Sequence, residues 1–152
     1  MRFAALFTLI LTTLSVGSAK ADTFSFSYSG WGTWEQTYYT CSAAEDILEG
    51  HLEKLGARGV RVSCSGGLEN WGNQWRTMPL SLRATYSVAP TTGGTRSVRF
   101  ASRGGRSTGC DFNTRLLNKL IPRFPEVQVV SKRDRCNGSN ARWEYVLAVP
   151  NN

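Results

Sequence analysis

Alternating apolar and polar residues predict strands at several places along the chain. Every second residue is apolar in 80–88 and again in 143–149, which is the period of a strand with one buried face. Shorter alternations at 24–28, 60–64, 98–100 and 127–129 predict further strands. These segments together give about six strands.

Apolar residues at helical spacing predict two helices, one after each of two cysteines. The apolar stripes are Ala44, Ile47, Leu48, Leu52 and Leu55 in the first helix, and Leu116, Leu117, Leu120 and Ile121 in the second. Ser42 and Glu45 have the spacing of a capping box, and Asp111 is the expected cap of the second helix. Gly56 and Pro122 are expected to end the two helices.

The order strand, helix, strand, strand therefore occurs twice. The two halves are residues 22–90 and 95–152, and the joint at 90–94 is rich in turn residues. This pattern predicts an α+β fold made of two β-α-β-β units in tandem, with the two helices packed on one face of antiparallel sheet. The halves either share one sheet or form two facing sheets, and the pattern does not choose between them.

The four cysteines are expected to form one disulfide within each half. Cys41 and Cys64 are 23 residues apart, and Cys110 and Cys136 are 26 apart. A helix after the first cysteine and a strand returning from it cover similar distances, so the second cysteine comes back level with the first. The cysteines do not occur in close pairs, so we expect no metal site.

The amino terminus has the pattern of a signal peptide. Arg2 is followed by an apolar run and by small residues around Ala21, which is the expected last residue of the segment 1–21. Residues 22–152 are then a single exported domain, periplasmic or secreted, with no membrane span in the mature chain.

One segment has no counterpart in the other half. Fifteen residues separate Cys64 from Leu80, whereas six separate Cys136 from Trp143. The longer segment is expected to be a loop whose two tryptophans, being four residues apart, share a face. With a second aromatic segment it supplies the candidate ligand-binding residues Trp31, Trp34, Asn70, Trp71, Asn73, Gln74 and Trp75. Flat rings and amides suit glycan or peptidoglycan fragments, but the rings could instead seal the loop onto the core.

Charge is divided unevenly between the halves. Residues 22–90 hold five basic and seven acidic residues, a balance of −2, whereas residues 91–152 hold eleven and four, a balance of +7. If the strands at 96–102 and 126–135 are neighbours, one basic patch forms from Arg96, Arg99, Arg103, Arg106, Lys132, Arg133 and Arg135. Such a patch could bind an acidic protein or a polyanion, or it could be a solvated face.

Candidate catalytic groups are few. His51 is the one histidine, and Glu35 and Glu69 are the carboxylates that flank the tryptophans. No nucleophile or metal motif is present, and we expect no catalytic residues and no cofactor. The sequence favours a non-catalytic exported binding protein that recognises cell-envelope glycan through the Trp-rich loop. The alternatives are a protein-interaction module or inhibitor with a basic face, and a small secreted hydrolase.

Overall fold

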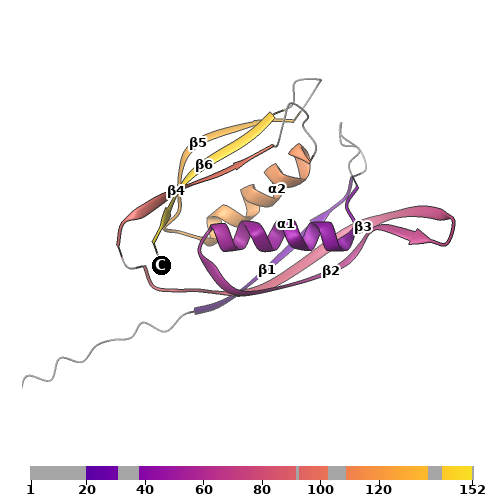
Figure 1. Cartoon of the computed structure of the whole chain (residues 1–152), viewed down its shortest axis with the longest axis horizontal. Coiled ribbons are helices and arrows are strands. Elements are labelled where there is room, and N and C mark those ends of the chain that lie inside the picture. Colours follow the sequence, from indigo (N-terminus) through magenta and orange to yellow (C-terminus); the bar gives the residue numbers. More distant parts are fainter. Residues whose placement is uncertain (1–19, 31–37, 92, 103–108, 137–141, 152) are drawn as a thin grey trace, which may run out of the picture.

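In a computed structural model of the whole chain, the structure describes residues 20–30, 38–91, 93–102, 109–136 and 142–151. The element order repeats β-α-β-β, as predicted (Figure 1). The first half holds β1 (Lys20–Tyr28), α1 (Cys41–Lys54), β2 (Ala57–Trp71) and β3 (Gln74–Val88). The second half holds β4 (Thr95–Ala101), α2 (Cys110–Leu120), the 3-10 turn η1 (Ile121–Arg123), β5 (Gln128–Arg135) and β6 (Arg142–Pro150).

Each half forms its own antiparallel sheet, which decides between the two arrangements that the sequence left open. The strand orders are β1-β3-β2 and β4-β6-β5, so the last strand of each half is central. Both helices lie between the two sheets (Figure 1). This arrangement buries one face of each sheet and leaves the other face to solvent.

The strand alternation seen in the sequence sets which sheet face is buried. In β3 the buried residues are Leu80, Leu82, Ala84 and Tyr86, and in β6 they are Trp143, Tyr145, Leu147 and Val149. The residues between them are more exposed, as expected for strands with a single apolar face. We call the buried side of each sheet its inner face and the opposite side its outer face.

Aromatic contacts join the two halves into one core. Phe112 of α2 packs edge-on against Phe26 and Tyr28 of β1, with ring centroids 5.6 and 5.0 Å apart. On the other side, the His51 ring of α1 contacts Phe100 of β4 at 4.9 Å. Each helix therefore touches the first strand of the opposite half as well as its own sheet.

Both predicted disulfides are present. Cys41 pairs with Cys64 and Cys110 with Cys136, with Cα–Cα distances of 5.5 and 5.4 Å. Each bond ties the first residue of a helix to a point on or just after the strand that returns from it. Closing loops of this length stabilises the folded chain by roughly 3 kcal/mol per bond in the chain-entropy model.

Both predicted helix caps were wrong by two residues. Thr40, not Ser42, caps α1, and its hydroxyl accepts a hydrogen bond from the Ala43 amide at 3.3 Å. In α2 the cap position is Gly109, and Asp111 lies inside the first turn, 3.0 Å from Arg115. The first cysteine of each disulfide is itself the first helical residue, so the cap falls on the residue before it.

The extra segment is a hairpin rather than a loop. β2 and β3 are each 15 residues long and stay paired to Trp71 and Gln74, and Gly72 and Asn73 form the turn. Gly72 has φ +69°, a conformation that suits two-residue hairpin turns. In Figure 1 the hairpin extends beyond both helices into open space.

Most of the expected signal peptide, residues 1–19, lies outside the described residues. Lys20 and Ala21 form the start of β1, opposite Val88 and Ser87 of β3. Among the described residues, none of the helices has the length and apolar character needed to cross a membrane. The two disulfides are compatible with an exported protein.

Candidate functional site

The end of the β2–β3 hairpin carries two tryptophans in contact with solvent. Trp71 is 58 % exposed and Trp75 is 63 % exposed, whereas Trp143 in the core is 6 % exposed. For Trp71 and Trp75, the structure therefore decides against the interpretation that the rings seal the segment onto the core. We call residues 69–76 the hairpin tip.

The two tryptophans lie on opposite faces of the hairpin, so the prediction of a shared face was wrong. In the register, Trp71 is opposite Gln74, and Asn70 is opposite Trp75. Directly opposed residues point to the same side of an antiparallel pair, and successive residues point to opposite sides. The two-residue turn lies between the tryptophans, so the four-residue spacing does not place them on one side.

Trp71 is held by charged neighbours on its own face. Its indole Nε1 donates a hydrogen bond to the Glu69 carboxylate at 2.9 Å, and the Arg76 guanidinium lies 5.2 Å from the ring centroid. Arg76 is directly opposite Glu69. The cation over the ring and the hydrogen bond at its edge both fix the orientation of the indole.

Trp75 occupies the other face, opposite an amide side chain. Its cross-strand partner is Asn70, and Leu68 and Thr77 are the next opposed pair on that face. Each indole of the tip is thus opposite an amide, Asn70 for Trp75 and Gln74 for Trp71. A ring that can stack on an apolar face next to an amide that can hydrogen-bond is a suitable combination for sugars.

Other predicted residues are only partly described. Trp31, Trp34 and Glu35 lie outside the described residues, so the structure places only two of the four tryptophans of the predicted site. Asn73 is in the turn and is exposed. Arg103 and Arg106 also lie outside the described residues.

The predicted basic residues do not share one face. β6 lies between β4 and β5, so the two basic strands are not neighbours. Arg96 and Lys132 are on the inner face, where they hydrogen-bond to the Lys54 carbonyl of α1 and to Asn118 of α2 at 3.0 and 3.1 Å. The remaining described members, Arg99, Arg133 and Arg135, are opposite outer-face positions of β6.

The outer face of the β4-β6-β5 sheet holds one arginine that the sequence analysis missed. Arg142 of β6 is directly opposite Arg135. Glu144, on the same face, pairs with Arg99 at 2.6 Å and is opposite Arg133. We call Arg99, Arg133, Arg135 and Arg142 the arginine face. The sequence shows that Arg142 and Glu144 lie on one face of β6, because they are two residues apart. It does not show that β6 lies between β4 and β5.

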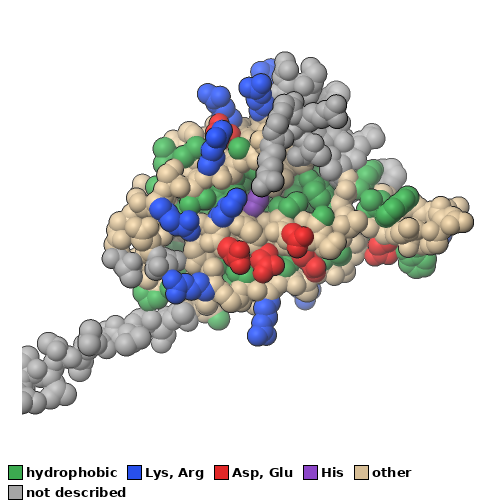
Figure 2. Space-filling view, viewed as in Figure 1, with side chains coloured by type: hydrophobic (Ala, Val, Ile, Leu, Met, Phe, Trp, Pro, Cys, Tyr) green, Lys and Arg blue, Asp and Glu red, His purple; other side chains and the backbone are tan. Residues whose placement is uncertain are grey.

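Acidic side chains gather on α1. Figure 2 shows them together over this helix, with basic side chains over the β4-β6-β5 sheet. The helix contains Glu45, Asp46, Glu49 and Glu53. The negative balance of the first half therefore comes mainly from one helix.

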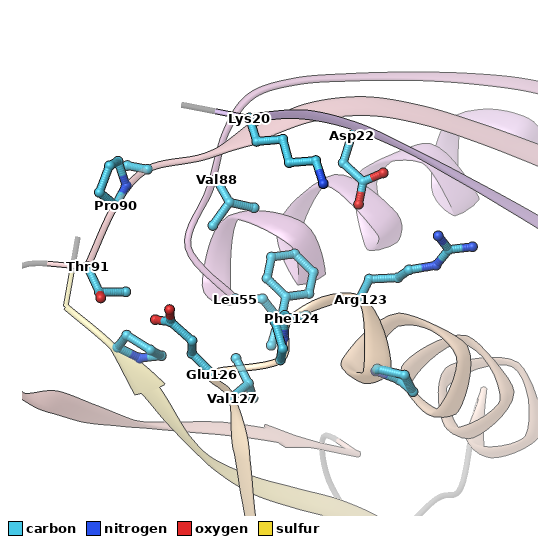
Figure 3. A pocket seen from close by; sticks show the side chains of 14 residues that line it. Lys20, Asp22, Leu55, Val88, Pro90, Thr91, Arg123, Phe124, Glu126 and Val127 are labelled. Carbon is cyan, nitrogen blue, oxygen red and sulfur yellow. The ribbon is translucent and has the colours of Figure 1, made fainter. Parts of the chain in front are cut away.

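A cleft of about 440 Å³ lies where the two halves meet, and no sequence pattern indicated it (Figure 3). It is lined by the start of β1, the segment after β3, the segment from η1 to Val127, and the end of β6. Its walls are largely apolar, including Leu55, Val88 and Phe124. Its volume is within the range of small-molecule sites.

His51 links the helices and is not exposed at a surface. Its Nε2 is 3.0 Å from Oδ1 of Asn113 in α2, and its side chain is buried. Burial lowers the pKa of His51 from 6.5 to about 4, and the positive charge of Lys54 acts in the same direction, against the hydrogen bond to Asn113. The histidine is therefore neutral at pH 7 and has a structural role in this arrangement.

Comparisons with protein-family models, curated proteins and solved structures gave no match to this chain.

Proposed function

We propose that the protein is an exported, non-catalytic binding protein that recognises cell-envelope glycan through the hairpin tip. One observation carries the proposal: two largely exposed indoles stand at the end of a hairpin, each opposite an amide side chain. Each exposed indole offers a large apolar surface, and burying that surface against a partner would be favourable. Sugar rings offer apolar C–H faces for the indole and hydroxyl groups for the amide.

The rest of the fold supports a role in binding. The corresponding strands of the second half, β5 and β6, are 8 and 9 residues long against 15 each for β2 and β3, so a sheet of this kind does not need the additional length. The tip is anchored at its base by Gly67, where the Leu68 amide donates to the Tyr39 carbonyl at 2.8 Å. The extension thus continues the paired strands β2 and β3 and projects from the scaffold, as recognition elements often do.

Because Trp71 and Trp75 lie on opposite faces of the hairpin, each would make a separate contact with a ligand. A single sugar ring is flat and cannot stack on both Trp71 and Trp75, because the hairpin lies between them. Each indole with its amide then makes one site. The tip would hold two glycan segments back to back rather than one segment in a groove.

Tryptophan fluorescence tests the proposal. Soluble peptidoglycan fragments and chitin oligosaccharides are titrated into the protein while emission is followed and stoichiometry is measured by calorimetry. We expect a blue shift and two sites per chain, Trp71→Ala or Trp75→Ala to remove one site each, and the double variant to remove binding. Val130→Ala is the matched control, because Val130 is 66 % exposed on the other sheet.

Two results would count against a glycan site. Unchanged emission across the panel means that these glycans are not the ligand. Complete loss of binding in either single variant means that both indoles enter one partner together, as a finger inserted into a protein cleft would.

A second candidate is a protein-interaction role for the arginine face. The observation that favours it is that Arg99, Arg133, Arg135 and Arg142 share the outer sheet face with one carboxylate of the described residues, Glu144. Guanidinium groups bind carboxylates in a bidentate way, and an acidic protein surface would supply them.

Salt and charge variants test this second candidate. Pull-down from envelope extract is compared for the wild type and for a chain with Arg133→Gln, Arg135→Gln and Arg142→Gln. We expect capture of acidic proteins that weakens with salt and is lost in the triple variant. The matched control replaces Arg58, Arg61 and Arg83, which lie on the outer face of the other sheet. Equal capture by both triple variants contradicts a specific role for the arginine face.

A further inference from the structure

The walls of the cleft between the halves are rich in proline. Four of the five prolines of the chain line it: Pro90, Pro122, Pro125 and Pro150. Proline fixes its own backbone angle φ, so these wall segments have fewer accessible conformations than the same segments without proline would have. A site that is already formed loses little conformational entropy when a ligand enters it.

Phe124 is the apolar centre of this cleft. Its side chain is 4 % exposed, and its ring stacks on Tyr86 of β3, with centroids 5.6 Å apart and planes at 14°. The backbone around it is also tied. The Phe124 amide donates to the Ile121 carbonyl and the Val127 amide donates to the Phe124 carbonyl, both at 3.0 Å.

Charged side chains of both signs line the cleft at separate places. Figure 3 shows Lys20, Asp22 and Arg123 on one side of Phe124 and Glu126 near Thr91 on the other. The Asp22 carboxylate accepts a hydrogen bond from Tyr86 at 3.3 Å, which fixes its position. One end of the cleft therefore has two cations and one anion, and the other end has one anion.

We propose that this cleft binds a short apolar peptide in its zwitterionic form, of about dipeptide size. Arg123 takes the carboxylate, Glu126 takes the ammonium group, and the apolar side chains lie against Phe124, Leu55 and Val88. The cleft carries no net charge, which favours a zwitterion over an anion or a cation. A volume near the lower end of the usual range for ligand sites favours a small ligand.

Removal of the expected signal peptide would leave the essential groups in place. Cleavage after Ala21 takes away Lys20 but creates a new ammonium group on Asp22, so the charge at that end is unchanged. Arg123 and Glu126 belong to η1 and to the connection that follows it. The inference is independent of the hairpin tip.

Blocked peptides test which ends are recognised. The full chain is exported from a host and its amino terminus is checked by mass spectrometry. Dileucine, N-acetyl-dileucine and dileucine amide are then titrated by calorimetry and by NMR of backbone amides. We expect dileucine to bind at millimolar concentration and to shift amides of Val88, Ala89 and Val127. Each blocked form should bind more weakly, by about two- to five-fold, the range for an exposed ion pair.

Matched variants connect each end to its residue. In Glu126→Gln, acetylation should no longer weaken binding, and in Arg123→Gln, amidation should no longer weaken it. Glu49→Gln and Arg83→Gln, on exposed sites away from the cleft, should keep the wild-type preferences. Three results would overturn the proposal: no amide shifts in the cleft at millimolar dileucine, equal binding of the free and blocked peptides, or equal sensitivity to blocking in all variants.

Discussion

The protein is expected to become less stable as the pH falls, and replacing His51 by glutamine should remove a large part of this acid sensitivity. The His51 side chain is 9 % exposed and faces Asn113 across the helix pair. Asn113 donates from its amide nitrogen to the Gly109 carbonyl at 2.8 Å, so its oxygen is directed to His51. The histidine must therefore donate from Nε2, and its neutral form satisfies this bond.

The size of the stability loss in acid follows from the pKa of His51 in the folded chain and in the unfolded chain. Burial lowers the pKa to about 4 in the folded chain, against 6.5 without burial. Between these values the unfolded chain binds more protons, so stability is fully present above pH 6.5 and is lost as pH falls toward 4. At about 1.4 kcal/mol for each pH unit, the complete loss is about 3 kcal/mol.

Urea unfolding of wild type and His51→Gln, at pH 7 and pH 5, measures this effect with the disulfides intact. Glutamine keeps an N–H for Asn113 but does not titrate in this range. We expect the wild type to lose about 2 kcal/mol more than the variant between the two pH values. Other titrating groups contribute equally to both chains and cancel in the difference.

NMR supplies an independent check. The chain contains one histidine, so its ring resonances need no further assignment. A titration midpoint above pH 6, or equal losses of stability in wild type and variant, would refute the reasoning from burial.

Further predictions concern the backbone and the hairpin, and each is checked by urea or thermal unfolding. Gly67→Ala should reduce the free energy of unfolding by more than about 2 kcal/mol, because φ is +88° and a Cβ would meet the Tyr39 carbonyl. Gly72→Ala, in the open turn, should reduce it by about 1 kcal/mol. Similar losses for the two variants would contradict the close approach at Gly67. Replacing both Cys41 and Cys64 by serine should cost roughly 3 kcal/mol, and a chain of unchanged stability would contradict the loop-entropy argument. Deleting residues 69–76 and rejoining the strands with a short turn should leave a cooperative unfolding transition; loss of that transition would show that the hairpin tip is part of the folding unit.

Much of the fold could be predicted because it depends on local periodicity. The alternation around Leu82 and Tyr145 reflects a sheet with one buried face, and that requirement acts directly on the sequence. The disulfides followed from the same repeat, since a helix and a returning strand cover similar distances. The choice between one shared sheet and two sheets could not be predicted, because it depends on contacts such as that of Phe112 with Phe26, between segments far apart in the chain.

The candidate site was only partly predictable, because the face on which a residue lies depends on whether a turn separates it from its neighbour. Residues four apart share a face in a helix or a strand, but not when a two-residue turn lies between them. Gly72 and Asn73 were the available signal of such a turn, since glycine and asparagine favour it. The cleft gave no signal at all, because its walls come from distant segments and its charges act together only after folding.

The distribution of charge is better described by layers than by halves. Both outer sheet faces carry arginines, including Arg61 and Arg83 on one sheet and Arg99 and Arg133 on the other. The difference between the halves comes from six more basic residues in the second half and three more acidic residues in the first, and four of the first half's acidic residues are on α1, at the edge between the sheets. A polyanion would then be attracted to either outer face and repelled from α1. A partner that prefers one sheet must therefore recognise the arrangement of the guanidinium groups rather than the net charge. For this reason, arginine variants of one sheet must be compared with arginine variants of the other.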